Sequence, residues 1–220
     1  MKQTLYTIIV LITGLCLSRS ALGQDLEAIL DEETKDTTRR VFSQATFKTT
    51  RIVNGQSMEN AKPKELIFVV SHHFDEVTTG IYDLFGIDNS NIRLGFEYGI
   101  NDRLALGVGR SSYQKYYDAS AKFKILRQQT GMRNIPLSVS VYSTAAIKTL
   151  RYDDQEKQED WKGRLSYTHQ LLIGRKMGSK LSLQLSPTLV HSNMVAAPSL
   201  PNDLFVLGAG GRYKLTNWVT

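Results

Sequence analysis

The stretch from Ile92 to Ser112 places large apolar side chains at every second position on both sides of a short polar break. Successive residues of a β-strand point to opposite faces, so this alternation predicts two strands that each have one apolar face. The apolar residues are Ile92, Leu94, Phe96, Tyr98 and Ile100, followed by Leu104, Leu106 and Val108. Both rows share one face of a hairpin only if the loop has an odd number of residues. Asn101 to Arg103 meets this condition, and Asn and Asp tolerate the left-handed backbone that such loops use.

A second pair of predicted strands covers residues 164–176 and 180–192. Leucines dominate one face of this pair, whereas Ser, Thr and Gln occupy the other face. The same parity rule requires an odd loop, and residues 177–179 provide it. A face of Ser, Thr and Gln suits a wet interior better than a dry protein core.

Strands with one apolar face suit either a soluble sandwich or barrel or a membrane β-barrel. About ten candidate strands of about ten residues follow residue 42, a length that suits a tilted bilayer crossing. Tight turns follow the third, seventh and ninth strands, and long loops follow the second, sixth and eighth. These turns and loops therefore lie at opposite ends, as in bacterial outer-membrane barrels. We predict an all-β fold, an antiparallel up-and-down transmembrane β-barrel.

The first predicted strand, residues 42–53, does not fit this scheme. The count places its start at the long-loop end, whereas an exported chain should begin at the periplasmic end. Three explanations remain open: residues 24–43 contain another strand, the N-terminal arm threads the barrel, or the boundary of the first strand is misplaced.

The first 23 residues have the features of a cleaved secretory signal peptide: a charged Lys2, an apolar core and small residues before Gln24. The apolar core is too short for a membrane-spanning helix, which needs about 20 residues. We expect a polar periplasmic arm over residues 24–41 and a β-barrel domain over residues 42–220. The arm is interpreted either as a mobile segment or as one that packs into the barrel mouth. The only cysteine, Cys16, lies in the signal peptide, so we expect the mature chain to have no disulfide.

The net charge of +6 is spread along the strands, so we predict no nucleic-acid partner. His72 and His73 are adjacent and point opposite ways in a strand, which argues against a shared metal ion. We expect no metal and no cofactor. The expected partners are outer-membrane lipid and small solutes, and the sequence does not identify a protein partner.

The polar face of the strands carries the residues that we expect to face the lumen: Arg93, Glu97, Lys122, Lys124, Gln170, Gln184, Arg212 and Lys214. Three interpretations remain open. These side chains pair with one another and fill a sealed structural or partner-binding barrel, or they line a passive, porin-like channel for small hydrophilic solutes. Alternatively they line a gated site for a less polar ligand, with the hydrophobic connection 75–91 as a plug that uses Tyr82, Leu84 and Phe85.

An outer-membrane lipid or ester hydrolase is a less favoured alternative. Ser166 and His169 point to opposite faces of one strand, so they cannot form a nucleophile and base pair with each other. Ser166 with a histidine from another strand remains open. We expect no catalytic residues and no enzymatic activity.

Several stretches together resemble a known family: ATFKTTRIVNG, LFGIDNSNIRLGFEYGINDRLALGVGRSSYQK, LSYTHQLLIGRK, LSLQLSPTLVH and LGAGGRYKL. The family consists of outer-membrane β-barrel proteins of Bacteroidota that are classified as a domain of unknown function. The resemblance implies an envelope barrel and brings no ligand or catalytic residues. Family members are longer at the carboxyl end, and a tenth strand begins at Trp218, so we expect a truncated member of a barrel with about twelve or more strands.

Overall fold

The structure is a computed structural model that describes residues 40–74, 76–88, 90–151, 153, 160–195 and 199–216. The predicted signal peptide, nearly all of the predicted arm and the predicted tenth strand at Trp218 lie outside these residues.

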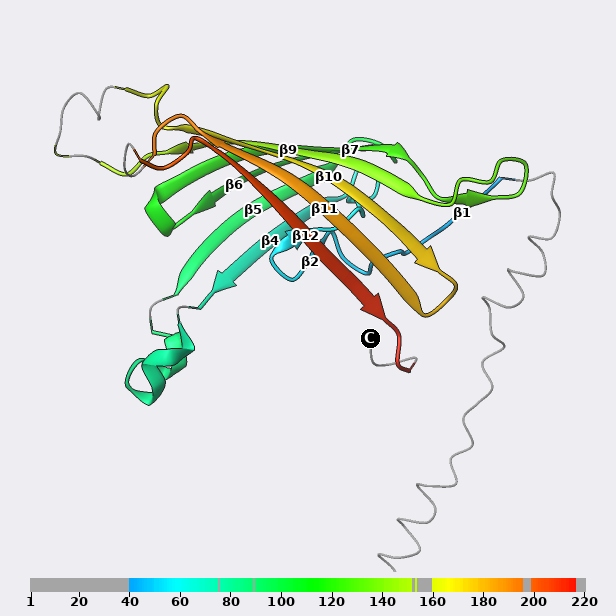
Figure 1. Cartoon of the computed structure of the whole chain (residues 1–220), viewed down its shortest axis with the longest axis horizontal. Coiled ribbons are helices and arrows are strands. Elements are labelled where there is room, and N and C mark those ends of the chain that lie inside the picture. The colour runs from blue at the N-terminus through cyan, green and yellow to red at the C-terminus, as the bar shows by residue number, and fades with distance from the viewer. Residues whose placement is uncertain are drawn as a thin grey trace, which may run out of the picture.

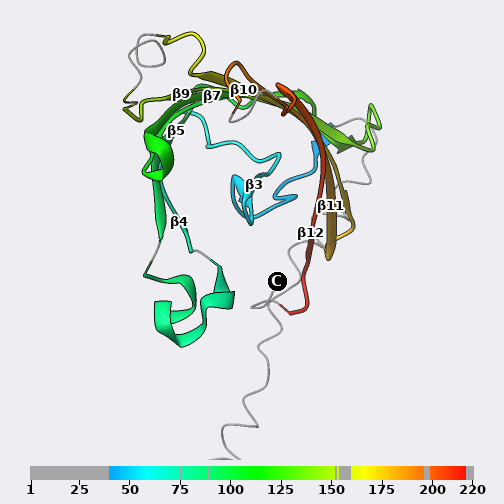
Figure 2. The same ribbon diagram turned by 60° about the vertical axis from the view of Figure 1, so that its left-hand side comes forward.

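Within the described ranges, eight strands form one antiparallel sheet in which each strand pairs with its sequence neighbours in the sheet. They are β4 (Leu66–His73), β5 (Asn91–Gly99), β6 (Leu104–Ser111), β7 (Tyr116–Leu126), β9 (Ser138–Lys148), β10 (Leu165–Met177), β11 (Leu181–Ser192) and β12 (Asp203–Tyr213). The sheet curls into about half of a barrel, with β4 and β12 at its edges (Figures 1 and 2). The predicted all-β, antiparallel up-and-down fold is confirmed.

Shorter elements accompany the sheet. They are β1 (Val41–Phe42) paired with β8 (Gln129–Thr130), β2 (Arg51–Ile52) paired with β3 (Gly55–Gln56), and the 3-10 helices η1 (Val77–Gly86) and η2 (Tyr113–Lys115). The part of the chain that the structure describes has no helix long and apolar enough to cross a bilayer.

The polarity of the sheet is the reverse of that of a soluble protein. Phe96, Leu106 and Leu183, which alternation places on the apolar face, are exposed on the convex side of the sheet. The concave side instead buries polar residues, among them Lys122 and Gln184. The apolar rows therefore point away from the centre of the fold, as an outward-facing membrane surface requires.

The connections between strands also segregate. The β5–β6 and β10–β11 connections are tight turns at one end of the sheet, while residues 74–90, 149–164 and 193–202 form longer connections at the other end (Figure 1). Two connections depart from this pattern. Residues 127–137, which link β7 to β9 and contain β8, are long at the tight-turn end, and residues 112–115, which link β6 to β7, are short at the other end.

The predicted first strand over residues 42–53 is wrong. These residues contain only the short β1 and β2, and residues 43–65 form an irregular segment on the concave side of the sheet (Figure 2). We call residues 43–65 the inner segment. Of the ten predicted strands, the structure therefore has eight, because the first is replaced by this segment and the tenth is outside the described residues.

Candidate functional site: the occupied interior

The inner segment reaches the sheet at its tight-turn end. The Lys64 amide donates a 2.7 Å hydrogen bond to the Gly99 carbonyl, and the Asn60 side chain donates to the Arg103 carbonyl in the β5–β6 turn. The strand β4 follows at once, so it starts at the tight-turn end. The chain thus enters the sheet at the end expected for an exported barrel, and the misfit found in the sequence disappears because residues 42–53 are not a spanning strand.

Lys122 of β7 holds the inner segment by its backbone. Its ammonium donates hydrogen bonds to the carbonyl oxygens of Glu59 at 2.8 Å, Ser57 at 3.1 Å and Thr50 at 3.3 Å. Lys122 is 4% exposed, and Ser57 is fully buried. A buried ammonium needs compensating acceptors, and here the carbonyls of an irregular segment supply them.

Gln184 of β11 makes a second attachment from the opposite side of the curved sheet. Its Oε1 accepts a 3.0 Å hydrogen bond from the Met58 amide, and its Nε2 donates at 2.8 Å to the Gln56 carbonyl. A primary amide that both donates to and accepts from the backbone of one segment fixes its position much as a neighbouring strand would.

Charged side chains of β5, β7 and β12 complete the attachment. Arg51 of the inner segment lies 2.7 Å from the Glu97 carboxylate on β5, and Glu59 lies 3.8 Å from the Lys124 ammonium on β7. On β12, Arg212 donates a 3.2 Å hydrogen bond to the Ala45 carbonyl. The inner segment therefore spans the concave side from β5 to β12.

Gly99 allows a close backbone approach between the inner segment and the sheet. A Cβ at this position would overlap the Lys62 carbonyl oxygen and would lie 2.6 Å from that of Ala61. Glycine is thus required here for space, because the obstructing atoms are backbone rather than flexible side chains.

The residues predicted to face the lumen lie on the concave side, but they have different roles there. Glu97, Lys122, Lys124, Gln184 and Arg212 contact the inner segment, as described above. Two of the others form contacts within the sheet: Arg93 pairs with Asp118 through both carboxylate oxygens, and Gln170 donates to Thr188 Oγ1 at 3.0 Å. The described contacts give the Lys214 side chain no partner in the inner segment.

The residues predicted as a plug have a different location. Tyr82, Leu84 and Phe85 lie in η1, beyond the end of β4, and Tyr82 is 90% exposed (Figure 2). The structure instead places residues 43–65 in the interior. Sequence reasoning missed this segment because its anchors are polar side chains distant in sequence; the only signal was the wrong entry end of the first predicted strand.

One known protein family matches this architecture. A family model described as a membrane bound beta barrel domain (DUF5777) matches residues 47–220. The chain belongs to this family of membrane-bound β-barrels. No curated protein and no solved structure matches it.

In a membrane-bound β-barrel the convex side of the sheet faces hydrocarbon, and alternation places His72, His169 and His191 on that side. His169 Nδ1 is 3.0 Å from Ser143 Oγ, and His191 Nδ1 is 2.7 Å from the Asp203 carboxylate. Ser166 lies on the concave side, so neither His169 nor His191 shares its face, whereas His73 lies on the concave face of the distant edge strand β4. The described residues contain no group of three or more His, Cys, Asp or Glu side chains that could hold a metal ion.

Proposed function

We propose that the protein is a gated channel of the bacterial outer membrane for small hydrophilic solutes, and that the inner segment is its gate. The carrying observation is the occupation of the polar concave side by residues 43–65, attached to β5, β7, β11 and β12. An always-open passive pore is disfavoured, because this segment fills the space through which solutes would pass.

The nature of the attachment supports a movable gate. Most of the contacts given above between the inner segment and the sheet are hydrogen bonds and ion pairs, whose donors and acceptors water can satisfy after detachment, while Met58 and Ala61 add buried apolar side chains. A polar cavity of about 150 Å³ remains between the segment and the β7–β9 wall, lined among others by Glu59, Lys124 and Ser140. Water in such a cavity would favour exchange of these contacts.

A sealed structural or partner-binding barrel is the second candidate. The complete burial of Ser57 and the near-complete burial of Lys122 favour it, because removing a buried charge from its acceptors is costly. The two candidates differ in one measurable property. In a gated channel the inner segment detaches while the sheet stays folded, whereas in a sealed barrel it stays attached as long as the sheet is folded.

Conductance in planar bilayers separates these candidates. We expect the parent protein to be mostly closed with rare openings, and Lys122→Met to open more often because the segment has lost its buried anchor. Lys214→Met removes the same charge from a residue that does not hold the segment, and should behave like the parent. In the open state, Arg212→Glu should shift selectivity from anions towards cations.

Folding is checked independently by the heat-modifiable mobility of the barrel on detergent gels. A Lys122→Met protein that is folded by this criterion yet never conducts would refute the gated channel and support the sealed barrel. Equal, constant conductance of parent and variant would instead refute the inner segment as a gate.

A further inference from the structure

A proline interrupts the sheet on its membrane-facing side. The residue pairs between β10 and β11 run as far as Gln170↔Thr188 and resume in the same register at Ile173↔Leu185. Pro187 of β11 falls in this gap, and it has no N–H to donate to a neighbouring strand. On its other side Pro187 remains in the continuous ladder with β12. The β10–β11 ladder is therefore locally open at the middle of β10.

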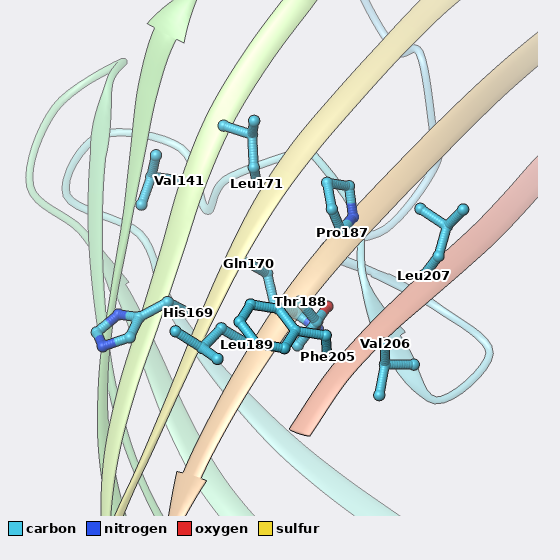
Figure 3. Close-up of a pocket in the computed structure, with 10 residues that line it drawn as sticks. All are labelled: Val141, His169, Gln170, Leu171, Pro187, Thr188, Leu189, Phe205, Val206 and Leu207. Atoms are coloured by element: carbon cyan, nitrogen blue, oxygen red, sulfur yellow. Dashed lines mark hydrogen bonds between the residues drawn. The ribbon is translucent and has the colours of Figure 1, made fainter. Parts of the chain in front are cut away.

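An apolar groove of about 520 Å³ lies over this opening. One wall is a row of outward side chains that crosses four strands: Val141, Leu171, Pro187 and Leu207 (Figure 3). The other wall is the next outward row, with His169, Leu189 and Phe205. The residues between the two rows, including Gln170 and Thr188, form the floor.

The shape of the groove follows from the residues in these rows. The proline ring is shorter than the leucines that precede and follow it on the outward face of β11, so the first row has a low point at Pro187. On β12, Leu207 is 71% exposed and projects from the first wall of the groove, and Phe205 is 78% exposed and projects from the second wall. The groove thus lies where β10 and β11 lack their ladder, and long apolar side chains border it.

We propose that this groove is a binding site for one acyl chain of a membrane phospholipid. Three observations on the molecule favour this occupant. The groove belongs to the convex side, which in a membrane-bound β-barrel is in contact with hydrocarbon. Its volume lies within the usual range of small-molecule sites, about 300–1,000 Å³. Its walls are apolar apart from one imidazole.

The side of the groove that would receive the headgroup is also identifiable, because amphipathic rings lie beyond one of its walls. Tyr167 and His191 are paired across β10 and β11 one step nearer the long-loop end, with their rings stacked 6.3 Å apart. Amphipathic rings of this kind are enriched at the boundary between hydrocarbon and headgroups. The headgroup would therefore lie beyond the His169–Leu189 wall, and the acyl chain would cross this wall into the groove towards Pro187.

Lipid tails are as apolar as leucine, so the hydrophobic effect does not select this chain over its neighbours in the bilayer. Selection rests on van der Waals contacts with the groove walls, which are weak individually and substantial together. Loss of roughly ten such contacts corresponds to about a fivefold loss of occupancy. This site is independent of the gate, because the inner segment lies on the other side of the sheet.

Native mass spectrometry tests the proposal on the full chain, reconstituted in palmitoyl-oleoyl phosphatidylethanolamine and then transferred to detergent. We expect the parent to retain one phospholipid. Val141→Phe, which fills the groove, should lower the bound-to-free ratio about fivefold. Val139→Phe makes the same change two residues away on the same face of β9, outside the groove, and should retain the lipid.

Pro187→Val is a second variant that restores an N–H to β11 and fills the low point of the groove, so it should also lose the lipid. Heat-modifiable mobility establishes folding of each variant before the measurement. A parent that retains no phospholipid would overturn the proposal. Equal retention by the parent, Val141→Phe and Pro187→Val would overturn it as well.

Discussion

The attachment of the inner segment to Lys122 gives a quantitative prediction. Lys122→Met keeps an unbranched side chain, one heavy atom shorter, but removes the donors to the carbonyls of Thr50, Ser57 and Glu59. Hydrogen bonds to charged groups contribute about 1.5–3 kcal/mol each. Detachment rehydrates the ammonium in the parent, which offsets part of this sum. We therefore expect a net loss of about 3 kcal/mol, or about a 150-fold higher population of the detached segment.

The reactivity of a buried cysteine measures this population. Ala61 in the inner segment is 3% exposed, so Ala61→Cys in a Cys16→Ser background should react with a maleimide only after the segment detaches. When reattachment is fast, the labelling rate follows the equilibrium population of the detached state. Lys122→Met should therefore raise the labelling rate by about two orders of magnitude.

Lys214→Met is the matched control for this experiment, and its labelling rate should equal that of the parent. A Lys122→Met protein that is folded, yet labels within twofold of the parent, would show that the buried ammonium does not hold the segment. The hydrogen bonds to the backbone carbonyls would then contribute nothing to its attachment.

Three further predictions follow from the same contacts. Gly99→Ala should destabilise attachment of the inner segment by about 1–3 kcal/mol, and so raise the rate of Ala61→Cys labelling, because the new Cβ meets backbone oxygens. Gly208→Ala is the control: a Cβ there has its nearest contacts at 3.5 Å, so the labelling rate should change little. Asp118→Asn should lower the urea midpoint for unfolding of the barrel in lipid, because it leaves the half-buried Arg93 without its carboxylate partner. A double-mutant cycle on Arg93 and Asp118 should give a coupling energy of about 1–3 kcal/mol, and additive effects would disprove the ion pair. Chymotrypsin should cut the folded protein in the exposed η1 and spare the inner segment; the reverse order of cleavage would contradict the positions of both.

The local pattern of the sequence was sufficient for the strands and their faces. The parity rule predicted a loop at residues 101–103, and in the structure Asn101 Oδ1 accepts hydrogen bonds from the amides of Arg103 and Leu104. The second hairpin turns one residue later than predicted, at residues 178–180, and Gly178 occupies the left-handed position there. Glycine takes that conformation without steric cost, which explains the shift.

The same local pattern failed at residues 42–53. Alternation identifies residues that could form a strand, but it does not show whether another strand supplies the backbone partners. Here part of that role passes to side chains of the sheet, such as Gln184, which is 126 residues away from Met58 along the chain. The polar face of the sheet was predictable from the sequence, whereas the segment that covers it was not.

The position of the inner segment has a consequence for assembly in the membrane. The inner segment is synthesised before every strand that anchors it, and its attachment points on the sheet range from Glu97 to Arg212. Arg212 binds the Ala45 carbonyl, which lies 167 residues earlier in the chain. Such long loops close slowly and only after their distant ends are in place. We therefore expect the inner segment to dock last, after the hairpins have inserted into the membrane and the curved sheet has formed. A docked inner segment would then indicate that the fold is complete.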